Sequence, residues 1–137
     1  MLQNNVFSDD LTIFSKINIM KTNPREILIY YNPESSSDRK TVAYAKSMSR
    51  HVKTYSHKDA HVTTTAWKSL LKKMDIEPKK LFNKALPEYQ SSLRGKELDE
   101  EGWLHVIKHN THLLRSPIAV RGDKVVLCER PTDIYKL

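Results

Sequence analysis

The hydrophobic and polar positions around residue 30 predict a buried strand, with a second strand about one helix length further on. The run at 27–31, Ile-Leu-Ile-Tyr-Tyr, is rich in β-branched and aromatic residues, and Asn32-Pro33 closes it with a turn signal. Residues 52–56 show a second short strand pattern. A strand, a helix and a strand in succession favour parallel pairing through a right-handed crossover.

Apolar residues at helical spacing predict the helices. Val42, Ala45 and Met48 fall on one face of the first helix, which Ser37 or Asp38 is expected to cap. The later helices are expected to begin at one of Thr63, Thr64 and Thr65, at Pro78, near Asp99 and Glu100, and at Pro131. The polar stretch 87–95 between them is predicted to be an irregular, mobile segment.

The C-terminal part of the chain predicts a β-hairpin. Apolar runs at 117–120 and 125–128 flank Gly122-Asp123, a short polar loop. The resulting order, β-α-β-α-α-α-β-β-α, predicts an α/β fold: a mixed sheet with helices on both faces. Residues 25–137 are expected to form this one domain. Residues 1–24 are predicted as an N-terminal extension, where disorder is favoured over an added strand because no clean period precedes Pro24.

Length and composition agree with one globular domain. The chain has 137 residues, of which 39% are hydrophobic. No apolar run approaches the roughly 20 residues that a membrane-spanning helix needs, so no membrane contact is expected. The first residues lack the basic start and the cleavage site of a signal peptide, and Asp9 and Asp10 interrupt their apolar pattern. A cytoplasmic location is therefore expected.

The net charge of +7 favours acidic partners or nonspecific contact with nucleic acid. A local cluster is formed by Lys68, Lys72, Lys73, Lys79, Lys80 and Lys84. A solvated helical face is the preferred interpretation, because no aromatic stacking residues alternate with these lysines. A nucleic-acid partner is accordingly not expected.

The cysteine and histidine content points away from metal and dithiol chemistry. Cys128 is the only cysteine, so neither an intrachain disulfide nor a C-x-x-C pair is possible. His105 and His109 lie four residues apart but lack the glutamate of an H-E-x-x-H motif. No metal and no cofactor are predicted. Cys128 ends an apolar strand and is expected to be a buried, structural residue, with Arg130 the only cation close in sequence.

Two local sequences carry a resemblance to a known family. The segment from Tyr30 to Thr41 is similar to an active-site sequence in which a strand and Asn-Pro lead into x-Cys-x-x-Ser-Arg. The segment from Leu113 to Pro131 is similar to a closing hairpin with Arg-Pro-Ile before it and Arg-Pro after it. Together with the order of elements, they resemble the glutaredoxin-linked (ArsC-like) arsenate reductases and the related Spx-type regulators. The resemblance covers about residues 25–137 and implies a thioredoxin-like fold with a helical insertion.

The sequence departs from this family at the positions that carry its chemistry. Ser35 occupies the position of the nucleophilic cysteine, whose thiolate the helix start stabilises in the family. Asn83 and Ser116 stand where two oxyanion-binding arginines are expected. Arg115 is the nearest replacement for the second, and Arg130 matches a third. No catalytic residue is therefore expected, and the chain is predicted to be a pseudoenzyme that serves as a binding or regulatory module.

The start of the first helix is a candidate anion site. It offers backbone N–H groups and the side chains of Ser35, Ser36, Ser37 and Arg39. A serine-rich capping turn with an exposed arginine explains the same residues, and both readings stay open. The alternative to the pseudoenzyme is an oxidoreductase or transferase that acts on a thiol or oxyanion substrate without a nucleophilic thiol of its own.

The segment before the third strand is the second candidate for ligand binding. The resemblance implies that the Ser116-Pro117 bond is cis and that Pro117 faces Ser35 across a shallow groove. An extended peptide could pair with the backbone there. The expected partners are thus an acidic protein surface or an extended peptide, with a small oxyanion as the other possible ligand.

Overall fold

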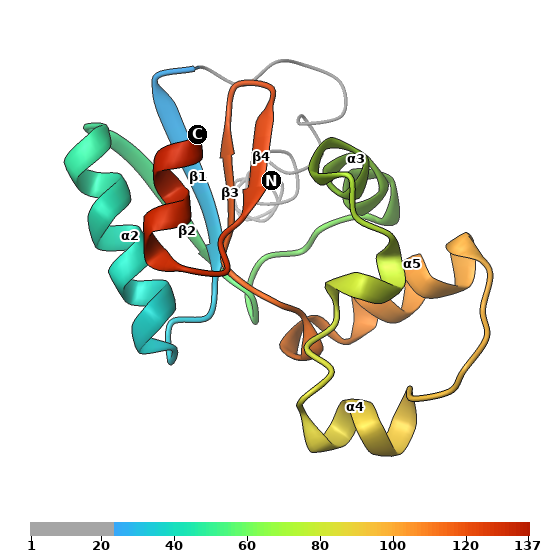
Figure 1. The fold of residues 1–137 in the computed structure, drawn as a ribbon. Coiled ribbons are helices and arrows are strands. Elements are labelled where there is room, and N and C mark those ends of the chain that lie inside the picture. Colours follow the sequence, from blue (N-terminus) through green and yellow to red (C-terminus); the bar gives the residue numbers. More distant parts are fainter. Residues whose placement is uncertain (1–23) are drawn as a thin grey trace, which may run out of the picture.

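The structure, a computed structural model, describes residues 24–137 (Figure 1). In chain order its elements are β1 (Glu26–Tyr31), α2 (Ser36–Met48), β2 (His51–Ser56), α3 (Thr64–Met74), η1 (Pro78–Leu81), α4 (Pro87–Ser92), α5 (Glu100–His109), η2 (Thr111–Leu113), β3 (Ile118–Arg121), β4 (Lys124–Leu127) and η3 (Pro131–Lys136), where η marks a 3₁₀ helix. Except for Pro24, the predicted N-terminal extension lies outside the described residues.

The four strands form one mixed sheet in the order β2-β1-β3-β4. β1 pairs in parallel with β2, with Ile27 opposite Val52, and antiparallel with β3, with Ile29 opposite Ala119. β3 and β4 form the predicted hairpin. Its turn contains Gly122 at φ +60°, a left-handed conformation that a residue without Cβ adopts most easily. The predicted βαβ unit, hairpin and mixed sheet are confirmed.

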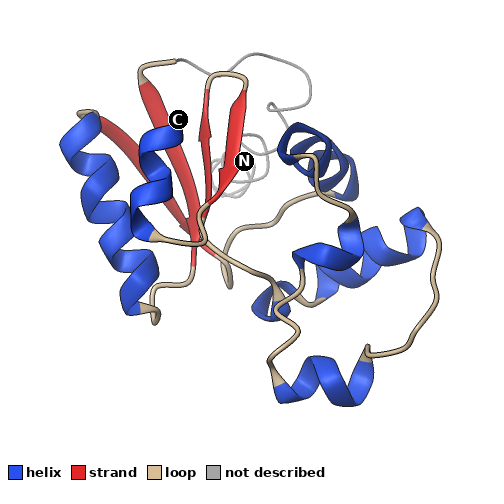
Figure 2. Ribbon diagram, viewed as in Figure 1, coloured by secondary structure: helices blue, strands red, loops and turns tan. Residues whose placement is uncertain are grey.

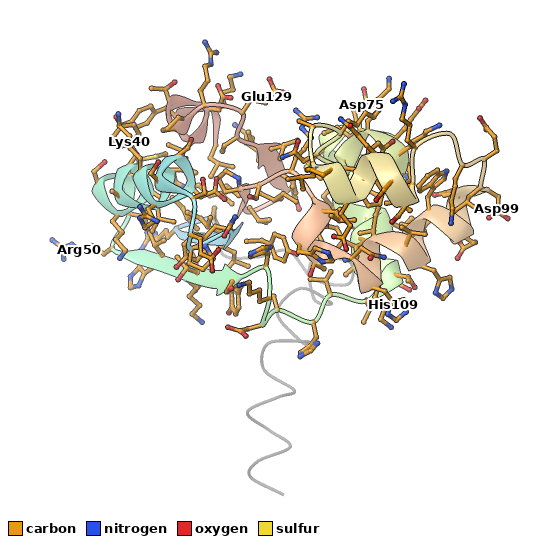
Figure 3. All side chains as sticks on the ribbon, turned by 90° about the horizontal axis from the view of Figure 1, so that it is seen from below. Lys40, Arg50, Asp75, Asp99, His109 and Glu129 are labelled. Atoms are coloured by element: carbon orange, nitrogen blue, oxygen red, sulfur yellow. The ribbon has the colours of Figure 1, made fainter. Side chains whose placement is uncertain are left out.

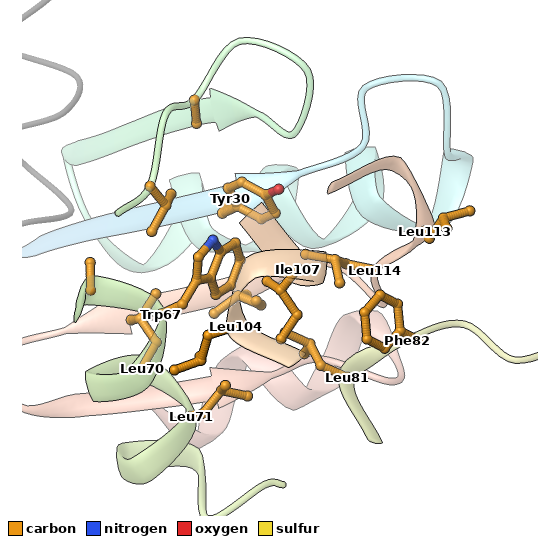
Figure 4. Close-up of a cluster of buried hydrophobic side chains, with 14 of the residues drawn as sticks. Tyr30, Trp67, Leu70, Leu71, Leu81, Phe82, Leu104, Ile107, Leu113 and Leu114 are labelled. Atoms are coloured by element: carbon orange, nitrogen blue, oxygen red, sulfur yellow. The ribbon is translucent and has the colours of Figure 1, made fainter. Parts of the chain in front are cut away.

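Helices cover both faces of the sheet, as predicted, and divide the hydrophobic core in two (Figure 2). On one face, α2 and η3 enclose a small cluster that includes Ile27 and Ile29. On the other face, α3 and α5 enclose a larger cluster with Leu28 and Tyr30 (Figure 4). Alternate β1 residues thus enter different clusters, as the two-residue period of a strand requires. A strand buried on both faces explains the unbroken apolar run at 27–31.

The segment 87–95, predicted to be irregular, contains the short helix α4. Pro87 occupies the first turn, where its missing N–H costs nothing. Tyr89 and Leu93 are buried, and the Tyr89 ring lies 5.8 Å from that of Phe82. Two buried side chains are too few to give a helical period in a polar sequence, so the helix was not predicted.

The predicted helices at Pro78 and Pro131 exist, but both are 3₁₀ turns. The hairpin strands are shifted by one residue, so Pro117 and Cys128 lie just outside β3 and β4.

Charged side chains point outward on every side of the described domain, including Lys40 on α2 and Asp75 at the end of α3 (Figure 3). Within residues 24–137, no helix is both long enough and apolar enough to cross a bilayer.

Candidate functional site

A pocket of about 430 Å³ lies where β1 ends and α2 begins. Figure 2 shows the loops that leave and enter the sheet at this edge. It is lined by Asn32, Ser35, Asp38, Asn83, Leu86, His112, Leu114, Arg115, Ser116, Leu127, Cys128 and Glu129. The pocket therefore gathers residues from both family-like segments of the sequence, at 30–41 and 113–131.

Ser35 is the N-cap of α2. Its backbone is extended (φ −83°, ψ 122°), and its hydroxyl oxygen accepts a hydrogen bond from the N–H of Asp38 at 3.2 Å. The sequence prediction of Ser37 or Asp38 as the cap is wrong. The Ser35 N–H already closes a turn onto the carbonyl of Asn32, which places the first helical residue at Ser36.

Asp38 is the buried charge at the centre of the site, with 3% of its surface exposed. Its Oδ2 accepts hydrogen bonds from the N–H of Asn32 at 2.8 Å and from the hydroxyl of Ser116 at 2.6 Å. Its Oδ1 accepts one from the Ser35 hydroxyl at 3.2 Å. A carboxylate in the first turn of a helix is also favoured by the positive end of the helix dipole. Asp38 thus joins the turn and helix start at 32–38 to the segment before β3.

Sequence reasoning missed this role for Asp38, although a signal was present. The family pattern x-Cys-x-x-Ser-Arg has a serine immediately before the arginine, and this chain has Asp38 before Arg39. An aspartate in place of this serine introduces a negative charge, which would repel an oxyanion bound at the same helix start.

The Ser116-Pro117 peptide bond is cis, as predicted. Ser116 lines the pocket and bonds to Asp38, which also binds Ser35, so the segment before β3 does meet the start of α2. Pro117 is buried behind it, and its carbonyl accepts the N–H of Cys128 at 2.9 Å. Ser116, and not Pro117, is the residue that lines the pocket opposite Ser35.

Of the candidate arginines, Arg115 lies at the pocket. Its guanidinium donates to the Lys80 carbonyl at 3.2 Å and forms an ion pair with Glu129. Arg39 instead donates to the Pro33 carbonyl at 2.9 Å and does not line the pocket.

The remaining candidates lie outside the pocket lining. The Arg130 side chain is 75% exposed and pairs with Asp133 at 3.5 Å. Ser36 and Ser37 are exposed on the first turn of α2. The structure therefore brings Ser35, Arg115 and Ser116 together at the pocket, and leaves Ser36, Ser37, Arg39 and Arg130 around it.

Cys128 is buried, as predicted, with 2% of its surface exposed, yet it also lines the pocket. Burial raises the pKa of its thiol to about 12, and the negative charges of Asp133 and Asp38 act in the same direction against the opposing charge of Lys136. The thiol is therefore protonated at neutral pH. Among residues 24–137, no group of three or more His, Cys, Asp or Glu side chains is placed to hold a metal ion.

The mixed β2-β1-β3-β4 sheet and the helices on both of its faces define a protein with the thioredoxin-like α/β fold of the ArsC proteins. The ArsC family model matches residues 30–137, and the chain belongs to the ArsC family.

Solved structures of similar fold include an arsenate-reductase-like protein from Yersinia pestis, with a TM-score of 0.76 at 20% identity over 82% of this chain and 100% of the other. The arsenate reductase from Vibrio cholerae gives 0.75 at 17% identity, covering 83% and 98%. An arsenate reductase (ArsC) related protein from Brucella melitensis gives 0.61 at 14% identity, covering 82% and 96%. No curated protein matches the chain by sequence. At these identities the structural likeness establishes the fold.

Proposed function

We propose that this ArsC-family chain is a binding or regulatory module that does not reduce arsenate. The observation that carries the proposal is the buried carboxylate of Asp38, which accepts hydrogen bonds from Asn32, Ser35 and Ser116. An oxyanion bound at the start of α2 would compete for the same donors. The helix start thus already has an anion of its own.

Electrostatics supports the same reading. Two like unit charges about 4 Å apart repel each other by about 4 kcal/mol at an effective dielectric constant of about 20. Arg115 is the only lysine or arginine among the lining residues, and its guanidinium pairs with Glu129. An arsenate or phosphate in the pocket would face the Asp38 carboxylate without a free arginine to offset it.

Neither Ser35 nor Cys128 is suited to act as a thiolate nucleophile in the pocket. Ser35 stands at the position that the family resemblance gives to the cysteine, and its hydroxyl is used as a helix cap. Cys128 is buried, and a thiol with a pKa near 12 supplies almost no thiolate at neutral pH. A cytoplasmic location belongs to the same proposal, because a single buried thiol requires no oxidising compartment.

One observation favours the alternative, an enzyme with different chemistry. The Ser35 hydroxyl donates a hydrogen bond to the Asp38 carboxylate. A general base beside a serine nucleophile is placed in the same way. At 3.2 Å this hydrogen bond is long, and the same hydroxyl oxygen already accepts the Asp38 N–H. Hydrolysis of an activated ester by the protein, lost in Ser35→Ala, would support this alternative.

The ligand we propose for the pocket is an extended peptide. Within residues 24–137, the backbone of Ser116 makes no hydrogen bond to other backbone, whereas the N–H of Arg115 pairs with Leu81 and the N–H of Cys128 pairs with Pro117. An extended segment could therefore add its own backbone hydrogen bonds at Ser116, beside the pocket.

The test combines turnover with oxyanion binding. We expect the purified protein to show no arsenate reduction with glutathione and glutaredoxin, and Ser35→Cys alone to restore little, because Asp38 still occupies the helix start and impairs oxyanion binding. We expect wild-type protein to bind phosphate weakly in calorimetric titration, and Asp38→Ser to bind it at least about tenfold more tightly, since the like charge is gone. Reduction above a no-protein control, or equal phosphate affinity in both proteins, would contradict the proposal.

A further inference from the structure

Two hollows on the helical side of the molecule, outside the pocket, are lined by cationic side chains. The first has a volume of about 430 Å³ and is lined by Lys80, Phe82, Asn83, Lys84 and Arg115. The second has a volume of about 470 Å³ and is lined by Lys79, Lys84, Tyr89, Gln90, Arg94 and Gly95. Because Lys84 lines both, the hollows adjoin and form one surface. We call its five cations, Lys79, Lys80, Lys84, Arg94 and Arg115, the basic track.

Four of the five cations of the basic track are not neutralised by the described part of the chain. No carboxylate lines either hollow. Nearby Glu88 pairs with His112, and Glu129 pairs with Arg115 at one end of the track. Within residues 24–137, the other four cations form no ion pair, although the Lys79 ammonium lies 5.7 Å from the Trp103 ring. Four neighbouring cations without a carboxylate partner are expected to attract an anionic ligand.

The shape of the basic track favours a chain-like ligand. The track follows η1, the 82–86 segment and α4, and it begins at Arg115, which also lines the pocket at the start of α2. Two adjoining hollows suit successive side chains of an extended segment better than one compact anion.

The aromatic residues that line the two hollows help to decide whether the ligand is an acidic peptide or a single-stranded nucleic acid. Phe82 is 1% exposed and Tyr89 is 4% exposed. Their rings are packed inside the domain, so they offer no faces on which bases could stack. Ion pairing without stacking is the pattern expected for carboxylate side chains.

We propose that the basic track binds an acidic segment of a partner protein, whose Asp and Glu side chains pair with Lys79, Lys80, Lys84 and Arg94. Exposed ion pairs are individually weak and are screened by salt, so binding depends on several contacts together and falls as salt rises. This surface is distinct from the Asp38 carboxylate, and the inference does not depend on whether the pocket binds a peptide.

The test is a titration of the full chain with a fluorescent peptide of about twelve residues in which glutamate alternates with serine, at about 50 and 200 mM salt. The test variant, Lys80→Gln/Lys84→Gln/Arg94→Gln, removes three track charges. The control, Lys46→Gln/Lys108→Gln/Lys124→Gln, removes three exposed charges that line neither hollow. Both variants have the same net charge, and circular dichroism checks that both are folded.

We expect the track variant to weaken peptide binding roughly tenfold or more at the lower salt, and the control to weaken it by less than about threefold. Equal weakening by the two variants would show that net charge alone attracts the peptide and would overturn the proposal. So would the absence of binding by the wild-type chain. Displacement of the peptide by a single-stranded oligonucleotide at lower concentration than by unlabelled peptide would reassign the track to nucleic acid, and equally overturn it.

Discussion

Three residues meet at Asp38, two from the preceding turn and one from 78 positions further along the chain, and each has a different role there. The Asn32 N–H fixes the turn after β1, Ser35 caps α2, and the Ser116 hydroxyl connects the segment before β3. Buried polar groups are costly to leave unpaired, so these three donors hold the Asp38 carboxylate in place at the edge of the pocket.

Cys128 gives a prediction at the residue scale. Raising its thiol pKa from 9.0 to about 12 lowers the thiolate fraction at pH 8 by about a thousandfold, and burial also blocks access. We expect N-ethylmaleimide to label the native protein at pH 8 at least about a hundredfold more slowly than the urea-unfolded protein. Rates measured by mass spectrometry check this, and native labelling as fast as in urea would contradict the structural role of Cys128.

Some of the site could be predicted from its residues, and the rest could not for a physical reason. The positions of Ser35 and Ser116 followed from the family-like segments, and the cis bond at Pro117 followed with them. The hydrogen bond between Ser116 and Asp38 joins residues 78 positions apart, and a periodic pattern of apolar residues gives no information on such a contact. The cap was misplaced because Ser35, Ser36, Ser37 and Asp38 are all good capping residues by type.

Among the elements, η3 shows how a short helix is held without a long apolar face. The Asp133 carboxylate accepts the N–H groups of Glu129 and Arg130, both at 3.0 Å. The backbone hydrogen bond from Arg130 is the main cause of a lowered pKa for Asp133; burial opposes this shift and Lys136 adds to it. Ile134 then packs η3 into the smaller core cluster.

The lowered pKa of Asp133 predicts an acid-sensitive η3. A lowered folded-state pKa means that the carboxylate contributes stability at pH values above about 4, and that this contribution is lost as pH falls further. We therefore expect thermal stability to fall less between pH 5 and about 2 in Asp133→Asn than in the wild type. Asp59→Asn, at an exposed site, serves as control and should follow the wild-type pH profile. Identical profiles for the wild type and Asp133→Asn would contradict this account.

Elements with strong periodicity were predictable, and those held by a few contacts were not. β1 has apolar residues on both faces, and α3 and α5 have regular buried stripes that include Trp67 and Leu104. α4 is anchored by Tyr89 and Leu93 only, so its sequence is polar on most sides.

In the whole molecule, one sheet separates two hydrophobic clusters of unequal size. The larger cluster contains Leu104, which is 1% exposed, whereas Leu98 is 41% exposed just before α5. This pair allows the same substitution to be compared inside and outside the core.

We expect Leu104→Ala to lower the free energy of unfolding by about 2–5 kcal/mol, because it removes buried methyl groups and leaves a cavity. Leu98→Ala should change it by less than about 1 kcal/mol. Urea denaturation of both variants measures the difference. Similar losses in the two variants would mean that α5 does not pack into the larger cluster as described.

Arg115 belongs to two surfaces at once, since its side chain lines the pocket at Asp38 and also ends the basic track. An acidic segment that reaches past Lys80 to Arg115 would therefore be thermodynamically linked, through this one guanidinium, to a ligand in the pocket. When such a segment draws Arg115 away from Glu129, the Glu129 carboxylate loses its cation at the mouth of the pocket. Binding of the segment would then raise the affinity of the pocket for a cationic group and lower its affinity for an anionic one. The sign of the cooperativity between the two ligands would thus report the charge of the ligand in the pocket.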